Sequence, residues 1–84
     1  MILITSNSCP PCNQLKVWLK HNKIEGYVRV LDCKYIEACN LIAKHNIRGV
    51  PALVHNGSVV VGYDDITEAI INNIANQLLS KQEI

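Results

Sequence analysis

The sequence predicts a small α/β fold in which the elements follow the order β-α-β-α-β-β-α. Two observations support this prediction. The apolar run from Met1 to Thr5 is followed by a segment with helical periodicity. Later, the runs Ala52 to His55 and Ser58 to Val61 flank Asn56-Gly57, a pair typical of a two-residue β-hairpin turn. Because the 84 residues contain no linker or repeat, we expect one domain over residues 1–84.

The first half of the chain predicts a strand, a helix and a second strand. The continuous apolar run at Met1 to Thr5 is typical of a strand that is buried on both faces. The helix is expected from about Pro10 to Asn22 and the second strand from Tyr27 to Leu31, parallel to the first across the helical crossover. Val28 and Val30 alternate along that strand. The expected buried stripe of the helix is Cys12, Leu15, Trp18 and Leu19.

Two further helices are expected on either side of the hairpin. The first ends near Arg48-Gly49, where glycine is a plausible stop. The second follows Gly62-Tyr63-Asp64, with Asp65 as its N-cap and Glu68 completing a capping box. The apolar positions that mark the first helix are Ile36, Cys39, Ala43 and Ile47, and those of the second are Ile66, Ile70, Ile74 and Leu78.

Charge and composition limit the classes of partner and the cellular compartment that we expect for this protein. The net charge is +1 and the basic residues are scattered, so no nucleic-acid partner is expected. The apolar N-terminus spans only a few residues, and we therefore expect neither a signal peptide nor a membrane span. These features predict a cytoplasmic protein, and the absence of a leftover apolar stripe in the sequence favours a monomer.

The sequence Cys9-Pro10-Pro11-Cys12 is the strongest indication of chemistry. If a helix begins near Pro10, Cys9 lies just before the first turn and Cys12 lies one turn inside, close enough to form a disulfide. The unpaired N–H groups and the helix dipole then favour a thiolate at Cys9. We therefore expect Cys9 to be the attacking sulfur and Cys12 the resolving sulfur.

A structural zinc site is the main alternative for a C-x-x-C motif. Such a site needs a second cysteine or histidine pair at a compatible spacing. Cys33 and Cys39 are six residues apart, which does not provide one, and no metal site is expected. Cys39 falls on the apolar stripe of its helix and is expected in the core, whereas the place of Cys33 is ambiguous.

The chain resembles the glutaredoxin branch of the thioredoxin superfamily in three motifs and in the order of its elements. The motifs are Cys9-Pro10-Pro11-Cys12, Val50-Pro51 and Gly62-Tyr63-Asp64-Asp65. The resemblance covers essentially the whole chain. It implies the thioredoxin fold, with a four-stranded mixed sheet flanked by three helices.

The resemblance also implies a set of substrate-binding residues. Pro51 would follow a cis peptide bond beside the thiols, and the backbone of Val50 would pair with bound glutathione or peptide. Asp64 and Asp65 would bind the amino and carboxyl ends of the glutamyl group of glutathione, with help from the helix N-terminus. The remaining positions assigned to substrate binding are Tyr63 and Pro11.

Several positions depart from the glutaredoxin pattern. Ser6 stands where many glutaredoxins have a lysine that binds a glutathione carboxylate, and Gly49 replaces the usual threonine before Val50-Pro51. The stretch from Asn46 to Leu53 is more similar to thioredoxins. The physiological reductant is therefore either glutathione or a thioredoxin reductase.

The function predicted from these features is dithiol–disulfide exchange of the glutaredoxin type. The expected partners are disulfide-containing proteins, with ribonucleotide reductase as one common client of such proteins, and glutathione is the expected co-substrate. No bound cofactor is expected. A thioredoxin-type protein disulfide reductase is the first alternative, and a metal or iron–sulfur binding module is an alternative of a different class.

Overall fold

A four-stranded mixed sheet forms the centre of the molecule in a computed structural model, which describes the backbone of residues 1–82 and the side chains of residues 1–75. The strand order is β2-β1-β3-β4. β1 runs parallel to β2 and antiparallel to β3, which pairs with β4 as a hairpin. The strand bounds are Ile2–Thr5 for β1, Arg29–Asp32 for β2, Ala52–His55 for β3 and Ser58–Val61 for β4.

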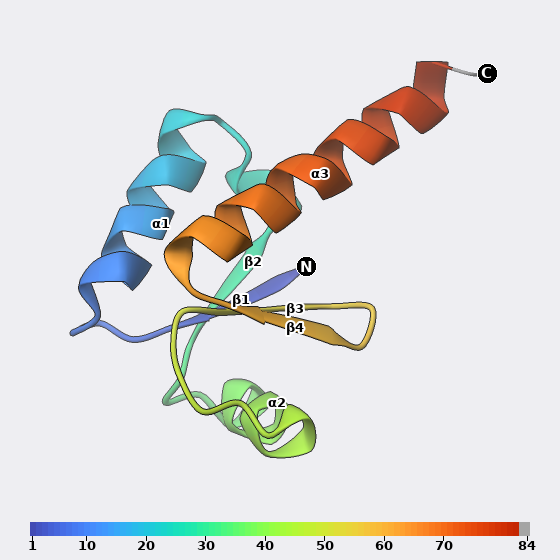
Figure 1. Ribbon diagram of the computed structural model, residues 1–84. Coiled ribbons are helices and arrows are strands. Elements are labelled where there is room, and N and C mark those ends of the chain that lie inside the picture. Colours follow the sequence, from blue (N-terminus) through green and yellow to red (C-terminus); the bar gives the residue numbers. More distant parts are fainter. Residues whose placement is uncertain (83–84) are drawn as a thin grey trace.

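Helices cover both faces of this sheet. α1 and α3 lie together on one face, and α2 lies on the other (Figure 1). The bounds are Pro10–His21 for α1, Ile36–His45 for α2 and Tyr63–Gln82 for α3, and a short 3-10 turn, η1, spans Glu25–Tyr27. The structure confirms the predicted order of strands and α-helices and the mixed sheet flanked by three helices. No helix within residues 1–82 is long and apolar enough to cross a membrane.

The central strand β1 separates two hydrophobic clusters. Because successive side chains of a strand point to opposite faces, Leu3 packs with the cluster beneath α1 and α3, whereas Ile4 packs with the cluster beneath α2. Both side chains are fully buried. In α1, the buried residues Cys12, Leu15 and Leu19 confirm most of the expected stripe, and Trp18 is half-buried at its edge.

The hairpin turn has the predicted residues and conformation. Asn56 has φ 50° and Gly57 has φ 81°, and positive φ at both central residues is characteristic of a type I′ turn. The register pairs His55 with Ser58 next to this turn. The turn chemistry therefore accounts for the position and the register of the hairpin.

The second strand begins two residues later than predicted. The chain first makes the 3-10 turn η1, in which the Val28 N–H donates to the carbonyl of Glu25, and β2 starts at Arg29. Val28 is buried, but Val30 is 39% exposed. The reason is that β2 lies at the edge of the sheet, where α1 does not fully cover it.

Three of the four residues predicted as the buried stripe of the second helix are exposed, whereas the fourth, Ile47, packs against the cluster beneath α2. Ile36 is 78% exposed, and Cys39 and Ala43 are exposed as well. The face turned toward the sheet instead carries Ala38, with Leu41 and Ile42 packed beside it. In this short helix, apolar residues occupy more than one face, so periodicity alone selected the wrong set.

The end of α2 also differs from the prediction. The helix stops before Asn46, which has φ 55°, and not at Gly49. The N–H of Ile47 donates to the carbonyl of Ile42 and that of Asn46 to Ala43, which is a Schellman arrangement. Asparagine tolerates the left-handed conformation better than most residues, and this explains why it ends the helix here.

The last helix begins earlier than its acidic residues suggested. The N–H of Ile66 donates to the carbonyl of Gly62, so Gly62 occupies the cap position. Asp64 and Asp65 therefore lie in the first turn, and the prediction that Asp65 is the N-cap was wrong. Ile66 and Ile70 are fully buried as expected and Ile74 packs against the same cluster, whereas Leu78 lies outside the residues whose side chains are described.

We expect Thr5→Val to stabilise the protein. Thr5 ends β1 with no exposed surface, and its hydroxyl finds no hydrogen-bond partner, in backbone or side chains, among the described residues. Removing an unsatisfied buried hydroxyl should raise the free energy of unfolding by about 1 kcal/mol, measured by urea denaturation. Thr5→Ser is the matched control, because it keeps the hydroxyl and loses only the methyl group. A Thr5→Val protein less stable than the parent would show that the hydroxyl is satisfied.

Candidate active site

The C-x-x-C segment joins the central strand to the first helix. Thr5 ends β1, a short loop follows, and Cys9 is the N-cap residue of α1 with extended backbone angles (φ −102°, ψ 110°). Cys9 and Cys12 form a disulfide, with their Cα atoms 5.2 Å apart. The expected positions of both cysteines, before and one turn inside the helix, are therefore found.

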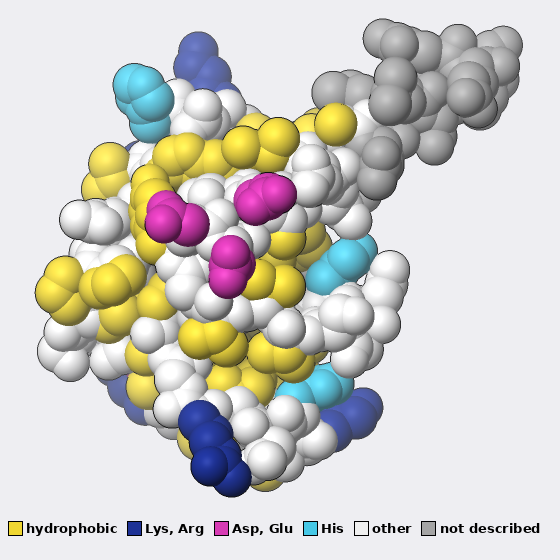
Figure 2. All heavy atoms as spheres, viewed as in Figure 1, with side chains coloured by type: hydrophobic (Ala, Val, Ile, Leu, Met, Phe, Trp, Pro, Cys, Tyr) yellow, Lys and Arg dark blue, Asp and Glu magenta, His cyan; other side chains and the backbone are white. Residues whose placement is uncertain are grey.

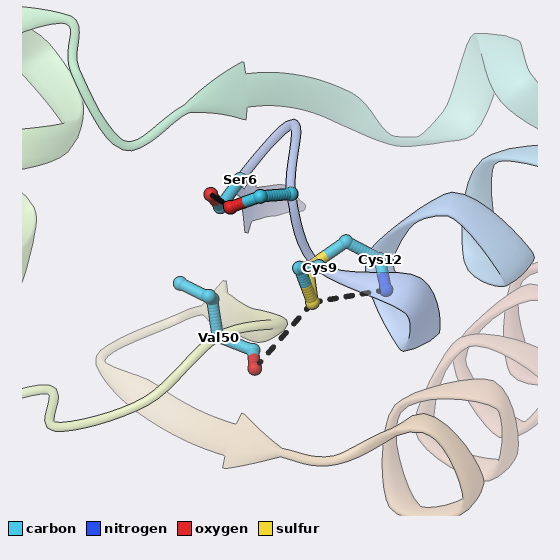
Figure 3. The surroundings of a disulfide bond; sticks show 5 residues. Ser6, Cys9, Cys12 and Val50 are labelled. Carbon is cyan, nitrogen blue, oxygen red and sulfur yellow. Dashed lines mark hydrogen bonds between the residues drawn. A yellow bond between two sulfur atoms is a disulfide. The ribbon is translucent and has the colours of Figure 1, made fainter.

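The helix N-terminus acts on one sulfur in particular. Pro10 and Pro11 occupy the first two helical positions and have no backbone N–H to offer. The first available donor is the N–H of Cys12, and it points to Cys9 Sγ at 3.2 Å (Figure 3). The positive end of the helix dipole thus faces Cys9 Sγ, where it would stabilise a thiolate in the reduced protein.

Burial separates the two cysteines further. Cys12 has no exposed surface and lies on the buried face of α1, whereas Cys9 is only partly buried. An external disulfide can therefore reach Cys9 but not Cys12. This arrangement matches a pair in which one sulfur exchanges with substrate and the other resolves the product.

The second motif lies against the first. The peptide bond between Val50 and Pro51 is cis, and Pro51 is buried at the start of β3. The carbonyl oxygen of Val50 is 3.8 Å from Cys9 Sγ (Figure 3). Residues about forty positions apart in the sequence are thus brought together at one end of the sheet.

The third motif is linked to the second by the backbone. The N–H of Gly62 donates to the carbonyl of Pro51 at 3.2 Å, which holds the start of α3 beside the Val50-Pro51 turn. Tyr63 is half-buried, and Asp64 and Asp65 are exposed on the first turn of α3. Pro11 is exposed beside the disulfide.

A groove between α1 and the start of α3 was not foreseen from the sequence. It has a volume of about 650 Å³ and begins at Asn13, directly after Cys12. The signal that could have revealed it is Val17, an aliphatic residue outside the buried stripe of α1 that is 68% exposed. The full lining is Asn13, Gln14, Val17, Trp18, His21 and Tyr63.

The other two cysteines are not bonded to the redox pair. Cys39 is exposed, which corrects the expectation that it is a core residue, and its Sγ donates to the carbonyl of Cys33 at 3.2 Å. Cys33 packs partly against the cluster beneath α2. Within the part of the chain that the structure describes, no three His, Cys, Asp or Glu side chains converge on a point where they could hold a metal ion.

Comparison with known proteins provides an informative match among solved structures. No protein-family model and no curated protein matches the sequence significantly. Among solved structures, the thioredoxin-like protein BC3987 is 31% identical in sequence, with a TM-score of 0.58. The match covers 74% of this chain and 85% of that one. The chain belongs to the thioredoxin-like proteins. In a thioredoxin-like fold, a disulfide at the N-terminus of α1 indicates a thiol–disulfide redox site.

We expect alkylation to distinguish the cysteines of this thioredoxin-like protein. In the oxidised protein, iodoacetamide should modify Cys39, which is exposed, and leave Cys9 and Cys12 unmodified. After reduction, Cys9 should react before Cys12, because Cys12 is fully buried. Mass spectrometry of the labelled peptides measures this order. Faster labelling of Cys12 than of Cys9 would contradict the assignment of roles.

Proposed function

We propose that this protein is a dithiol–disulfide oxidoreductase in which Cys9 attacks and Cys12 resolves. The single observation that carries the proposal is the environment of Cys9 Sγ, which is partly exposed, accepts the first amide of α1 and lies beside Val50. Cys12, by contrast, is enclosed. These differences are what a two-step exchange requires.

The reaction transfers two electrons to the substrate. The Cys9 thiolate attacks one sulfur of a substrate disulfide, that bond breaks, and the departing sulfur takes up a proton. Cys12 then loses its proton and attacks Cys9 Sγ in the mixed disulfide. The second substrate sulfur leaves as a thiol, and the Cys9–Cys12 disulfide remains for an external reductant.

The proposed reductant is glutathione, as in glutaredoxins. The support comes from the start of α3, where backbone N–H groups suit a carboxylate and the side chains of Asp64 and Asp65 suit an ammonium group. Both groups occur on the glutamyl end of glutathione. The link from Gly62 to Pro51 keeps this helix end beside the turn that faces Cys9.

Reduction by a thioredoxin reductase is the second candidate. It is favoured by Ser6, a neutral residue at the position where many glutaredoxins carry a lysine, and by the similarity to a solved protein named thioredoxin-like. Both candidates use the same chemistry at Cys9 and differ only in how the disulfide is reduced again.

Single cysteine variants test the proposed roles. Cys9→Ser should lower the rate of thiol–disulfide exchange by more than about a thousandfold, because it removes the nucleophile. Cys12→Ser should still attack and should accumulate a mixed disulfide, visible as an increase in mass. Cys39→Ser is the control and should leave the rate unchanged. Activity retained by Cys9→Ser would overturn the mechanism.

Two coupled assays identify the reductant. In the first, the protein turns over a glutathione mixed disulfide with glutathione and glutathione reductase. In the second, it reduces insulin with NADPH and thioredoxin reductase. We expect turnover in the first assay. Turnover in the second assay alone would assign a thioredoxin-type cycle instead.

A further inference from the structure

The groove between α1 and α3 lies next to the redox pair and is not used by the exchange reaction. Its near end is formed by Asn13, whose N–H donates to the carbonyl of Cys9. Its other wall is formed by Tyr63. The residue before Tyr63 is Gly62, whose N–H donates to the carbonyl of Pro51. A substrate chain whose cysteine is bonded to Cys9 can therefore continue into this groove without leaving the surface.

The walls of the groove are mainly apolar. Val17 is 68% exposed, and Trp18 and Tyr63 each present part of an aromatic ring. The groove is shallow and open to solvent, with a volume of about 650 Å³. This space exceeds what a single thiol substrate needs near the sulfur, and it fits a large apolar side chain with the backbone that carries it.

The two sides of α1 differ in charge. No lysine or arginine lines the groove. Lys16 and Lys20 instead line a separate depression on the side of α1 that faces Val30 of the edge strand. A ligand in the groove therefore meets neither Lys16 nor Lys20, and the basic residue in the lining is His21, in the last turn of α1.

Acidic side chains lie on the first two turns of α3, next to Tyr63 in the sequence but outside the lining of the groove. Asp64 and Asp65 directly follow Tyr63, and Glu68 lies one turn further along the same helix; all three are exposed. Figure 2 shows acidic side chains gathered over the start of α3, with hydrophobic side chains next to them. An apolar groove with acidic residues on the neighbouring helix turns complements a ligand that is both apolar and positively charged.

We propose that the groove binds a segment of the client protein that carries a large apolar side chain and a lysine or arginine within a few residues of the disulfide cysteine. This inference rests on the proposed function, since it names the class of protein substrate for the same redox site. The apolar side chain packs on Val17, Trp18 and Tyr63. The cationic side chain pairs with the carboxylates at the start of α3.

Two short peptides test the proposal as disulfide-linked dimers. The first contains phenylalanine and lysine close to its cysteine, and the second has glutamate in place of lysine. With dithiothreitol as the reductant that regenerates the full-length protein, and with the uncatalysed rate subtracted, we expect the lysine peptide to be reduced with a kcat/KM about five- to tenfold higher at low salt. The difference should shrink at high ionic strength, because exposed charges are then screened.

Two pairs of variants show which part of the surface causes the preference for the lysine peptide. Glu68→Lys should remove most of the preference for lysine, whereas Glu25→Lys, the same change of charge at an exposed site away from the groove, should keep it. Val17→Gln should lower kcat/KM for both peptides about threefold. Ile36→Gln, at another exposed aliphatic residue on a helix, should not. Reduction of hydroxyethyl disulfide, a substrate too small to reach the groove, should be the same in all four variants.

A binding measurement separates failure of the inference from failure of the proposed function. The protein contains one tryptophan, Trp18, and it lies in the groove. Versions of both peptides with serine in place of cysteine can therefore be titrated by following its fluorescence, without any redox step. The proposal requires tighter binding of the lysine peptide and loss of that preference in Glu68→Lys.

The outcomes are distinct. If hydroxyethyl disulfide is not reduced, the proposed function fails, and the fluorescence titration still decides whether the groove binds the cationic peptide. If hydroxyethyl disulfide is reduced but the two peptides show equal kcat/KM and equal binding, the inference about the groove is overturned and the oxidoreductase function stands. A preference for the glutamate peptide would also overturn it.

Discussion

The contact between the Cys12 N–H and Cys9 Sγ is the interaction around which the site is organised. A helix usually begins with several free amides, but Pro10 and Pro11 remove the first two here. The first remaining amide, that of Cys12, points to the Sγ atom of Cys9, the residue at the N-cap position. The same helix buries Cys12 completely. The two cysteines therefore differ in their surroundings, and the roles proposed for them rest on this difference.

The sheet determines what this sulfur faces. β1 lies between β2 and β3, so the loop that leaves its end emerges in the middle of the sheet edge. β3 runs antiparallel to β1, and the turn at Val50 and Pro51 that begins it therefore reaches the same edge. Gly62, at the end of β4, joins them through its bond to Pro51. Three segments distant in sequence meet at Cys9 because of strand order and direction, without any direct bond between their functional side chains.

Much of this architecture was predictable because it depends on local chemistry. The Asn56-Gly57 turn, the two prolines after Cys9 and the buried stripe of α1 each act within a few residues, and the structure agrees with all three. The errors arise where tertiary packing decides between local alternatives. α2 is apolar on more than one face, and only the sheet beneath it selects Ala38 over Cys39. The groove was not predicted, because its walls come from two helices that the sequence separates by about forty residues, and Val17 alone signals an exposed apolar position on α1.

The two sides of α1 carry different side chains, and this difference concerns the substrate as well as the sulfur. One helix supplies the amide that contacts Cys9, the buried face that packs on the sheet and one wall of the groove beside Tyr63. Its lysines are kept to the opposite side, toward the edge strand. Positive charge near a thiolate would help to stabilise it, but in this helix the group that contacts Cys9 Sγ is a backbone amide. The surface next to the disulfide is mainly apolar, with acidic residues on the neighbouring first turns of α3, and this is the surface to which the client segment is proposed to bind.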